Sequence, residues 1–160
     1  MPFKLSVAII TYNEEKNLKR CLESVNGLWD ELIIVDSGSE DETKRIAESF
    51  GAKFIHNDFE GHIQQKNFAL DQCQFDMVLS LDADEALSSD LKSRVQELKQ
   101  KKDGGFFVFN RMTNYRGLQF LLLKGLIFGY KARKEIGTSI NATEKARQQW
   151  SGPLVTGSYL

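Results

Sequence analysis

Short apolar runs that alternate with amphipathic segments constrain the fold of this chain more than any other feature. Residues 5–10 are rich in β-branched side chains and end at the polar sequence TYNEE, as expected of a strand buried on both faces of a parallel sheet. After Asn13, a candidate helix N-cap, apolar residues recur at helical spacing until Asn26 and Gly27. These residues predict a strand followed by a helix.

The same alternation continues along the chain. Later strands are predicted in the segments ELIIVD, KFIH, MVLSL and FFVFN. Helices are predicted between them, one after the capping-box spacing of Ser39 and Glu42, and another after Ser88 or Ser89, with an apolar face of Leu91, Val95 and Leu98. Alternation of this kind predicts an α/β fold in which helices cover both faces of a mostly parallel sheet.

Polar residues follow three of the predicted strands. They occupy residues 11–14, 36–39 and 82–85. Because ligands of open α/β sheets bind beyond the carboxyl ends of the strands, these three segments are expected to open on one edge and to form the site.

The segment VLSLDADEAL places three carboxylates, Asp82, Asp84 and Glu85, within four positions. Like charges about 4 Å apart repel by roughly 4 kcal/mol at an effective dielectric constant near 20. Two aspartates separated by one residue offer hard oxygen ligands to Mg²⁺ or Mn²⁺, and such a cation also lets the site accept a diphosphate. The alternative is an ordinary group of solvated loop acids.

The other loops offer groups that suit a nucleotide. Asp36 could accept hydrogen bonds from a base or a ribose, and Thr11 and Asn13 could line the nucleotide. Lys66 could reach a phosphate from its helix. The alternatives are a helix cap for Asn13, a loop acid for Asp36 and a solvated lysine for Lys66.

Four segments together form a family resemblance. SVAIITYNEEKNLKRCLESV, LIIVDSGSEDET, QQKNFAL and LSLDADE, in this order, resemble the nucleotide-sugar-binding half of family 2 glycosyltransferases, which have the Rossmann-like glycosyltransferase-A fold. The continuation FVFNRMTNY resembles the bacterial subgroup that adds glucose to the lipopolysaccharide core. The resemblance covers about residues 4–115 and divides the chain into a nucleotide-sugar-binding domain, 1–115, and a divergent tail, 116–160.

The resemblance implies roles for the matching residues. The uridine, ribose or diphosphate of a UDP-sugar would be held by residues of all four segments, namely Thr11, Asn13, Glu14, Asp36, Lys66, Asp82 and Ala83. Asp84, with Asp82, would bind Mg²⁺ or Mn²⁺, and Glu85 would orient its neighbours or act as a first-turn acid.

The implied activity is metal-dependent, inverting transfer of a hexose to a lipopolysaccharide core or other lipid-linked saccharide, with glucose from UDP-glucose as the expected donor. The family's catalytic base is a carboxylate beyond the acid pair, but after Asp103 the chain has only Glu135 and Glu144, and neither matches it. A truncated, noncatalytic nucleotide-sugar-binding module is therefore the alternative. A phosphotransfer enzyme with Asp82 as nucleophile would leave the segments around Thr11 and Asp36 unexplained.

The charge of the chain is unevenly distributed. The net charge is −1, which argues against nucleic acid as a partner, yet eight basic and two acidic residues give the part of the chain from Gly104 onward a charge of about +6. The tail contains LQFLLLKGLIFGY, too short for a membrane span of around 20 residues. An interfacial helix on an anionic membrane and a core helix are the two interpretations left open.

Without a secretion signal at its start, the chain is expected in the cytoplasm, with peripheral contact to the inner membrane as one alternative.

Overall fold

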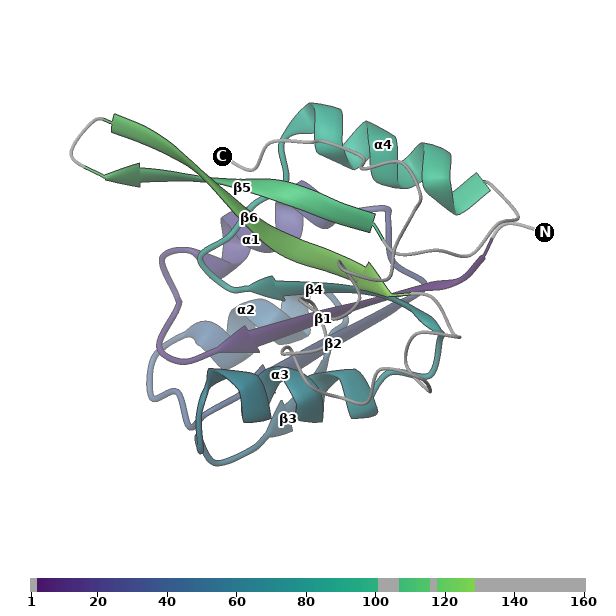
Figure 1. Ribbon diagram of the computed structural model, residues 1–160. Coiled ribbons are helices and arrows are strands. Elements are labelled where there is room, and N and C mark those ends of the chain that lie inside the picture. Colours follow the sequence, from purple (N-terminus) through teal and green to yellow (C-terminus); the bar gives the residue numbers. More distant parts are fainter. Residues whose placement is uncertain (1–2, 101–106, 116–117, 129–160) are drawn as a thin grey trace.

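The computed structural model describes residues 3–100, 107–115 and 118–128, which form a six-stranded sheet with helices on both faces (Figure 1). The strands are β1 (Leu5–Thr11), β2 (Glu31–Asp36), β3 (Lys53–His56), β4 (Met77–Asp82), β5 (Phe107–Tyr115) and β6 (Leu118–Phe128). The helices are α1 (Leu18–Val25), α2 (Thr43–Ser49), α3 (His62–Asp71) and α4 (Ser89–Gln100). The spatial order of the strands is β3-β2-β1-β4-β6-β5.

The first four strands of the chain form the parallel part of the sheet. β1 lies at its centre and pairs with β2 on one side and with β4 on the other. Every residue of β1 is buried, as predicted from its run of β-branched and apolar side chains. The predicted α/β fold with a mostly parallel sheet is therefore confirmed.

The sheet separates two apolar layers, because successive side chains of a strand point to opposite faces. Val7 and Ile9 of β1 belong to the larger cluster, which includes residues of α1, α2 and α4. Ala8 and Ile10 belong to the smaller cluster with Ala69, and Figure 1 shows α3 on that side of β1 and β2. Because both faces of these strands are buried, their sequences are nearly continuous apolar runs and do not alternate between apolar and polar residues.

The segment predicted as a helix in the tail is a strand. β6 pairs antiparallel with β4 and, along most of its length, with β5. Both interpretations of this segment, interfacial helix and core helix, are therefore wrong. The periodicity of a short apolar run does not separate a strand from a helix, and here the free edge of β4 offers a strand partner. In the described part of the chain, none of the helices combines the length and apolar character that crossing a membrane requires.

The predicted helix starts are corrected in two places. α1 begins at Leu18, after Asn17, so Asn13 is not its cap. α2 begins at Thr43, whose amide donates a hydrogen bond to the Asp41 carboxylate. Ser39 and Glu42 therefore form no capping box at the start of this helix. Ser88 does cap α4, because its hydroxyl accepts a hydrogen bond from the Leu91 amide at 3.2 Å. Asn13 and Ser39, the first two cap candidates, instead form hydrogen bonds between the loop after β1 and the loop after β2.

Candidate functional site

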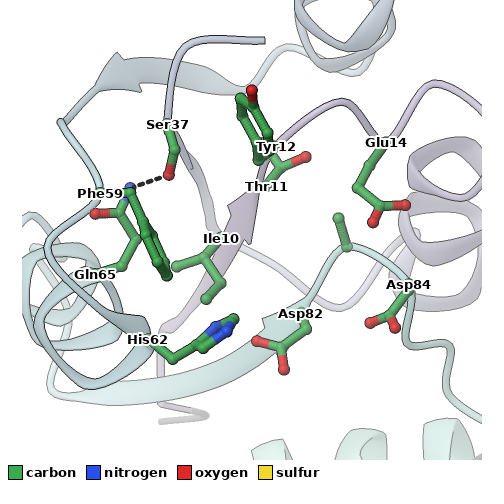
Figure 2. A pocket seen from close by; sticks show the side chains of 11 residues that line it. Ile10, Thr11, Tyr12, Glu14, Ser37, Phe59, His62, Gln65, Asp82 and Asp84 are labelled. Carbon is green, nitrogen blue, oxygen red and sulfur yellow. Dashed lines mark hydrogen bonds between the residues drawn. The ribbon is translucent and has the colours of Figure 1, made fainter.

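A cleft with a volume of about 550 Å³ opens at the carboxyl ends of the parallel strands. Figure 2 shows its side chains, which come from the ends of β1 and β4, the loop after β2, and the start of α3 with the segment before it. The lining residues are Ile10, Thr11, Tyr12, Glu14, Ser37, Phe59, His62, Gln65, Asp82, Ala83 and Asp84.

Parallel pairing brings these segments together. Thr11 lies opposite Asp36 in the β1–β2 register, and Ile10 lies opposite Asp82 in the β1–β4 register. The pairing continues past the strand ends, because the Ser37 amide donates to the Thr11 carbonyl at 3.0 Å and the Ala83 amide donates to the Ile10 carbonyl at 3.1 Å. The polar segments after β1, β2 and β4 therefore open on one edge, as the sequence predicts.

Five of the eight nucleotide-sugar-binding and metal-binding residues implied by the resemblance line this cleft. They are Thr11, Glu14, Asp82, Ala83 and Asp84. The other three, Asn13, Asp36 and Lys66, are not among the lining residues. Lys66 contacts the lining residue Asp82, whereas Asp36 and Asn13 hydrogen-bond to residues of the loop after β2.

Thr11 is the polar residue of β1 that faces the cleft. Its side chain is 5% exposed, and its hydroxyl oxygen has no hydrogen-bond partner within the described residues. A buried hydroxyl without a partner costs about 1–3 kcal/mol, so native proteins rarely keep one without a function. The Thr11 hydroxyl is therefore available to a ligand.

Asp36 and Asn13 organise the loop after β2. The Asp36 carboxylate accepts hydrogen bonds from the amides of Gly38, at 2.9 Å, and Ser39, at 2.7 Å, and from the Ser39 hydroxyl. Asn13 has a φ of 51°, a left-handed conformation that asparagine tolerates, and its side-chain oxygen accepts from the Glu40 amide at 2.9 Å. The two residues thus join the loops after β1 and β2.

The acid segment after β4 is held by neighbouring groups. Lys66 of α3 places its ammonium 2.7 Å from Asp82 Oδ1, and the Glu85 carboxylate accepts from the Asp82 amide at 2.9 Å. Arg20 of α1 donates to the Asp84 carbonyl at 2.7 Å. The Asp84 carboxylate itself is exposed at the wall of the cleft (Figure 2).

The donor set fits a hard divalent cation that shares its coordination with a ligand. Among the described residues no cluster of three or more His, Cys, Asp or Glu side chains forms a closed metal cage. Mg²⁺ typically uses only one or two carboxylates together with water and substrate phosphates. Asp82 and Asp84 offer two carboxylates on one cleft, and Lys66 partly offsets their charge in the ligand-free protein.

Several lining residues were given no individual role by the sequence reasoning. Gln65 and His62 lie in the segment HIQQKNFAL, whose lysine was singled out, and Ser37 directly follows Asp36. Tyr12 and Phe59 are 59% and 53% exposed, and the Phe59 ring meets His62 edge-on at 5.1 Å. Exposed aromatic side chains at a cleft indicate a binding site, but the exposure of a side chain depends on the tertiary structure, and the sequence pattern does not show it.

Comparison with known proteins agrees with this geometry. A family model described as glycosyl transferase family 2 matches residues 6–156. An uncharacterized glycosyltransferase of Rickettsia typhi is 44% identical over 120 residues, covering 75% of this chain and 38% of the relative. The lipopolysaccharide core biosynthesis glycosyltransferase LpsC of Rhizobium meliloti is 38% identical over 104 residues, covering 62% of this chain and 38% of LpsC. The chain thus spans less than half the length of these relatives.

Solved structures share the fold. Glucosyl-3-phosphoglycerate synthase from Mycobacterium tuberculosis, solved with Mn²⁺, UDP-glucose and phosphoglyceric acid, superposes with a TM-score of 0.74 at 17% identity, covering 98% of this chain and 70% of the synthase. TarS of S. aureus in complex with UDP gives a TM-score of 0.68 at 20% identity, covering 97% of this chain and 57% of TarS. The family match also continues past residue 115. The chain has the glycosyltransferase-A fold and belongs to glycosyltransferase family 2.

Proposed function

We propose that this chain binds a UDP-sugar together with Mg²⁺ or Mn²⁺ and transfers the hexose, with inversion, to a lipid-linked saccharide. One observation carries the proposal: the free hydroxyl of Thr11 and the acid pair of Asp82 and Asp84 open on the same cleft. A nucleoside needs polar groups at one end of such a site, and a diphosphate needs a cation at the other.

Each residue contributes a defined interaction. Thr11 hydrogen-bonds the uridine, while Asn13 and Asp36 act on it through the loop that they hold. Lys66 lies beside the diphosphate, and Glu14, Asp82 and Ala83 form the adjoining wall. Asp84, with Asp82, holds the cation, which supplies charge neutralisation for the diphosphate leaving group.

The reaction is a displacement at the anomeric carbon. The acceptor hydroxyl oxygen bonds to this carbon, the bond from the carbon to the diphosphate oxygen breaks, and UDP leaves. The hydroxyl proton passes to a general base. Glu135 and Glu144, the only carboxylates after Asp103, lie outside the described residues.

The donor and acceptor are the finer parts of the proposal. LpsC supports a lipopolysaccharide core as acceptor, and the synthase solved with UDP-glucose supports glucose as donor. With such an acceptor, the protein would work in the cytoplasm at the inner membrane face. The part of the chain from Gly104 onward, with about six net positive charges, suits peripheral contact with anionic lipid.

The test is the Asp84→Ala variant. We expect it to weaken Mn²⁺-dependent UDP binding by roughly tenfold or more, because the cation loses a carboxylate ligand and the diphosphate loses the cation. Isothermal titration calorimetry with Mn²⁺ and with EDTA measures the effect. Glu97→Ala, which removes an exposed carboxylate of α4, is the matched control. Unchanged affinity in Asp84→Ala would refute the proposed cation site.

A nucleotide-sugar-binding module without transferase activity is the second candidate. The observation in its favour is the poverty of carboxylates after Asp103, where only Glu135 and Glu144 occur. A turnover assay with UDP-glucose and a lipopolysaccharide acceptor separates the two candidates. Transfer that is lost in Glu135→Gln or Glu144→Gln excludes the inert module, whereas UDP binding without any transfer supports it.

A further inference from the structure

Gln65 is a buried amide in the wall of the proposed nucleotide cleft. Its side chain is 1% exposed and lies between the loops that follow β2 and β3. Its Nε2 atom is 3.0 Å from the Ser37 hydroxyl oxygen and 3.2 Å from the Asn57 carbonyl oxygen, and its Oε1 atom is 2.7 Å from Asn57 Nδ2. Figure 2 shows the contact between Gln65 and Ser37.

The orientation of this amide is fixed by backbone carbonyls, which can only accept hydrogen bonds. Because Gln65 approaches the Asn57 carbonyl, the approaching atom must be its NH₂ group. The Asn57 amide is fixed in the same way, since its Nδ2 donates to the Asp58 carbonyl at 3.2 Å. Both amides therefore present nitrogen and oxygen in a unique arrangement, and Gln65 donates to Ser37.

This arrangement sets the role of the Ser37 hydroxyl. Ser37 Oγ accepts a hydrogen bond from Gln65, so its own proton remains free, and within the described part of the chain that proton has no acceptor. Ser37 lines the cleft and is only half-buried. A ligand atom that accepts a hydrogen bond would satisfy this proton, whereas an amino group in its place would leave the proton unpaired.

The position of Ser37 indicates which part of the ligand it meets. In Figure 2, Ser37 and Asp84 lie at opposite sides of the cleft. The acid pair is the cation and diphosphate end, so the Ser37 end faces the nucleoside. The exposed rings of Tyr12 and Phe59 lie on this side of the cleft, and flat aromatic surfaces suit a base.

We propose that Gln65 is a positioning residue that fixes Ser37 as a hydrogen-bond donor to an acceptor oxygen of the bound nucleoside. This inference rests on the proposed function, because it requires a nucleotide in the cleft. The nucleoside would thus be recognised by the Ser37 hydroxyl, which Gln65 positions, in addition to the Thr11 hydroxyl.

The test compares UDP affinity, by calorimetry in the presence of Mn²⁺, for the 160-residue chain and four variants. Ser37→Ala is expected to bind UDP about fivefold more weakly, because it loses the donor, while Ser37→Thr keeps the hydroxyl and the affinity. Gln65→Met should show a similar loss. Because Gln65 acts through Ser37, the double variant Ser37→Ala with Gln65→Met should bind no more weakly than the weaker single variant.

A second ligand distinguishes the two ends of the cleft. Pyrophosphate with Mn²⁺ probes the acid end alone, and its affinity should be equal in the unmodified chain and Ser37→Ala. Equal loss for UDP and pyrophosphate would overturn the inference, as would additive losses in the double variant, which indicate a merely structural Gln65. If the unmodified chain binds pyrophosphate but not UDP, the proposed function fails. If it binds UDP and Ser37→Ala does so equally well, the inference alone fails.

Discussion

Thr11 and Thr43 are two buried threonines whose hydroxyl groups have different surroundings. Both threonines are buried, but the Thr43 hydroxyl accepts a hydrogen bond from the Glu14 amide at 2.9 Å, whereas the Thr11 hydroxyl has no partner in the described residues. The desolvation cost of Thr11 is already present in the ligand-free protein. Replacement of each hydroxyl by a methyl group should therefore have opposite consequences.

Thr11→Val is expected to leave the free energy of unfolding unchanged or to raise it by about 1 kcal/mol, because the variant no longer buries an unpaired hydroxyl. Its affinity for UDP should fall by roughly fivefold. Urea unfolding and calorimetry measure the two quantities. Thr43→Val is the matched control and should lose about 1–3 kcal/mol, since the Glu14 amide is left without its acceptor. A large loss of stability in Thr11→Val would show that its hydroxyl has a structural partner.

At the scale of whole elements, helix α1 connects the loop after β1 with the segment after β4. It follows the loop after β1, and Arg20 donates to the Asp84 carbonyl, while the Ser24 hydroxyl accepts from the Leu87 amide at 3.0 Å. The Cys21 thiol lies against the Asp82 carbonyl, and burial raises the pKa of this thiol well above its usual range. Cys21 therefore remains a neutral packing group behind the acid segment.

Helix α4 is tied to the opposite end of the sheet by an ion pair. Lys99 Nζ lies 2.6 Å from the Asp30 carboxylate, which also accepts from the Leu5 amide at 2.8 Å. Partial burial raises the pKa of Asp30, but the hydrogen bonds from Lys99 and Leu5 and the charge of Lys99 outweigh it, so the pKa lies below its ordinary value of 3.8. The carboxylate is therefore favoured in the folded state.

A lowered carboxyl pKa stabilises the fold above the unfolded-state pKa, and this stabilisation is lost as the pH falls through the folded-state pKa. Lys99→Met should therefore lower the free energy of unfolding at pH 7 and have a smaller effect at a pH low enough to protonate Asp30, which lies below the ordinary pKa of 3.8. Urea unfolding at both pH values measures the difference. Lys44→Met, whose exposed lysine lies 4.0 Å from Glu48, should change little at either pH. An equal loss for Lys99→Met at both pH values would contradict the role of the ion pair.

At the scale of the molecule, the cleft is built from loops that only the parallel sheet brings together. The segments after β1, β2 and β4 meet at one edge, and α3 supplies Lys66 and Gln65 from the face of the sheet that it covers. A ligand that spans the cleft would therefore stabilise the whole parallel unit. Binding to the folded state alone contributes about 2.7 kcal/mol at a ligand concentration of 100 times Kd.

UDP and Mn²⁺ added together are therefore expected to raise the unfolding temperature by several degrees, more than the sum of the separate effects, because the cation offsets the charge of the diphosphate at the acid pair. Differential scanning calorimetry measures the shift, and Asp84→Ala provides the control in which the joint effect disappears. Equal shifts with and without Mn²⁺ would contradict a shared site.

The sequence alone determined the order of strands and helices in the first 100 residues. Burial on both faces selects apolar β-branched strands, and the helices keep one apolar face, so each element carries its own signal. The family resemblance likewise identified five of the residues that line the cleft. These properties are local, because each depends on neighbours within a few positions of the chain.

Only the tertiary structure decided the nature of residues 118–128 and the partners of the polar side chains. The apolar run could serve as a helix or a strand, and the free edge of β4 made it a strand. Ser39 and Asn13 fit helix caps by spacing, yet they bond to each other's loops. Gln65 resembles any helical glutamine until the fold places Ser37 and Asn57 around it. A hydrogen bond between residues distant in sequence depends on their separation in space, and spacing along the chain does not encode it.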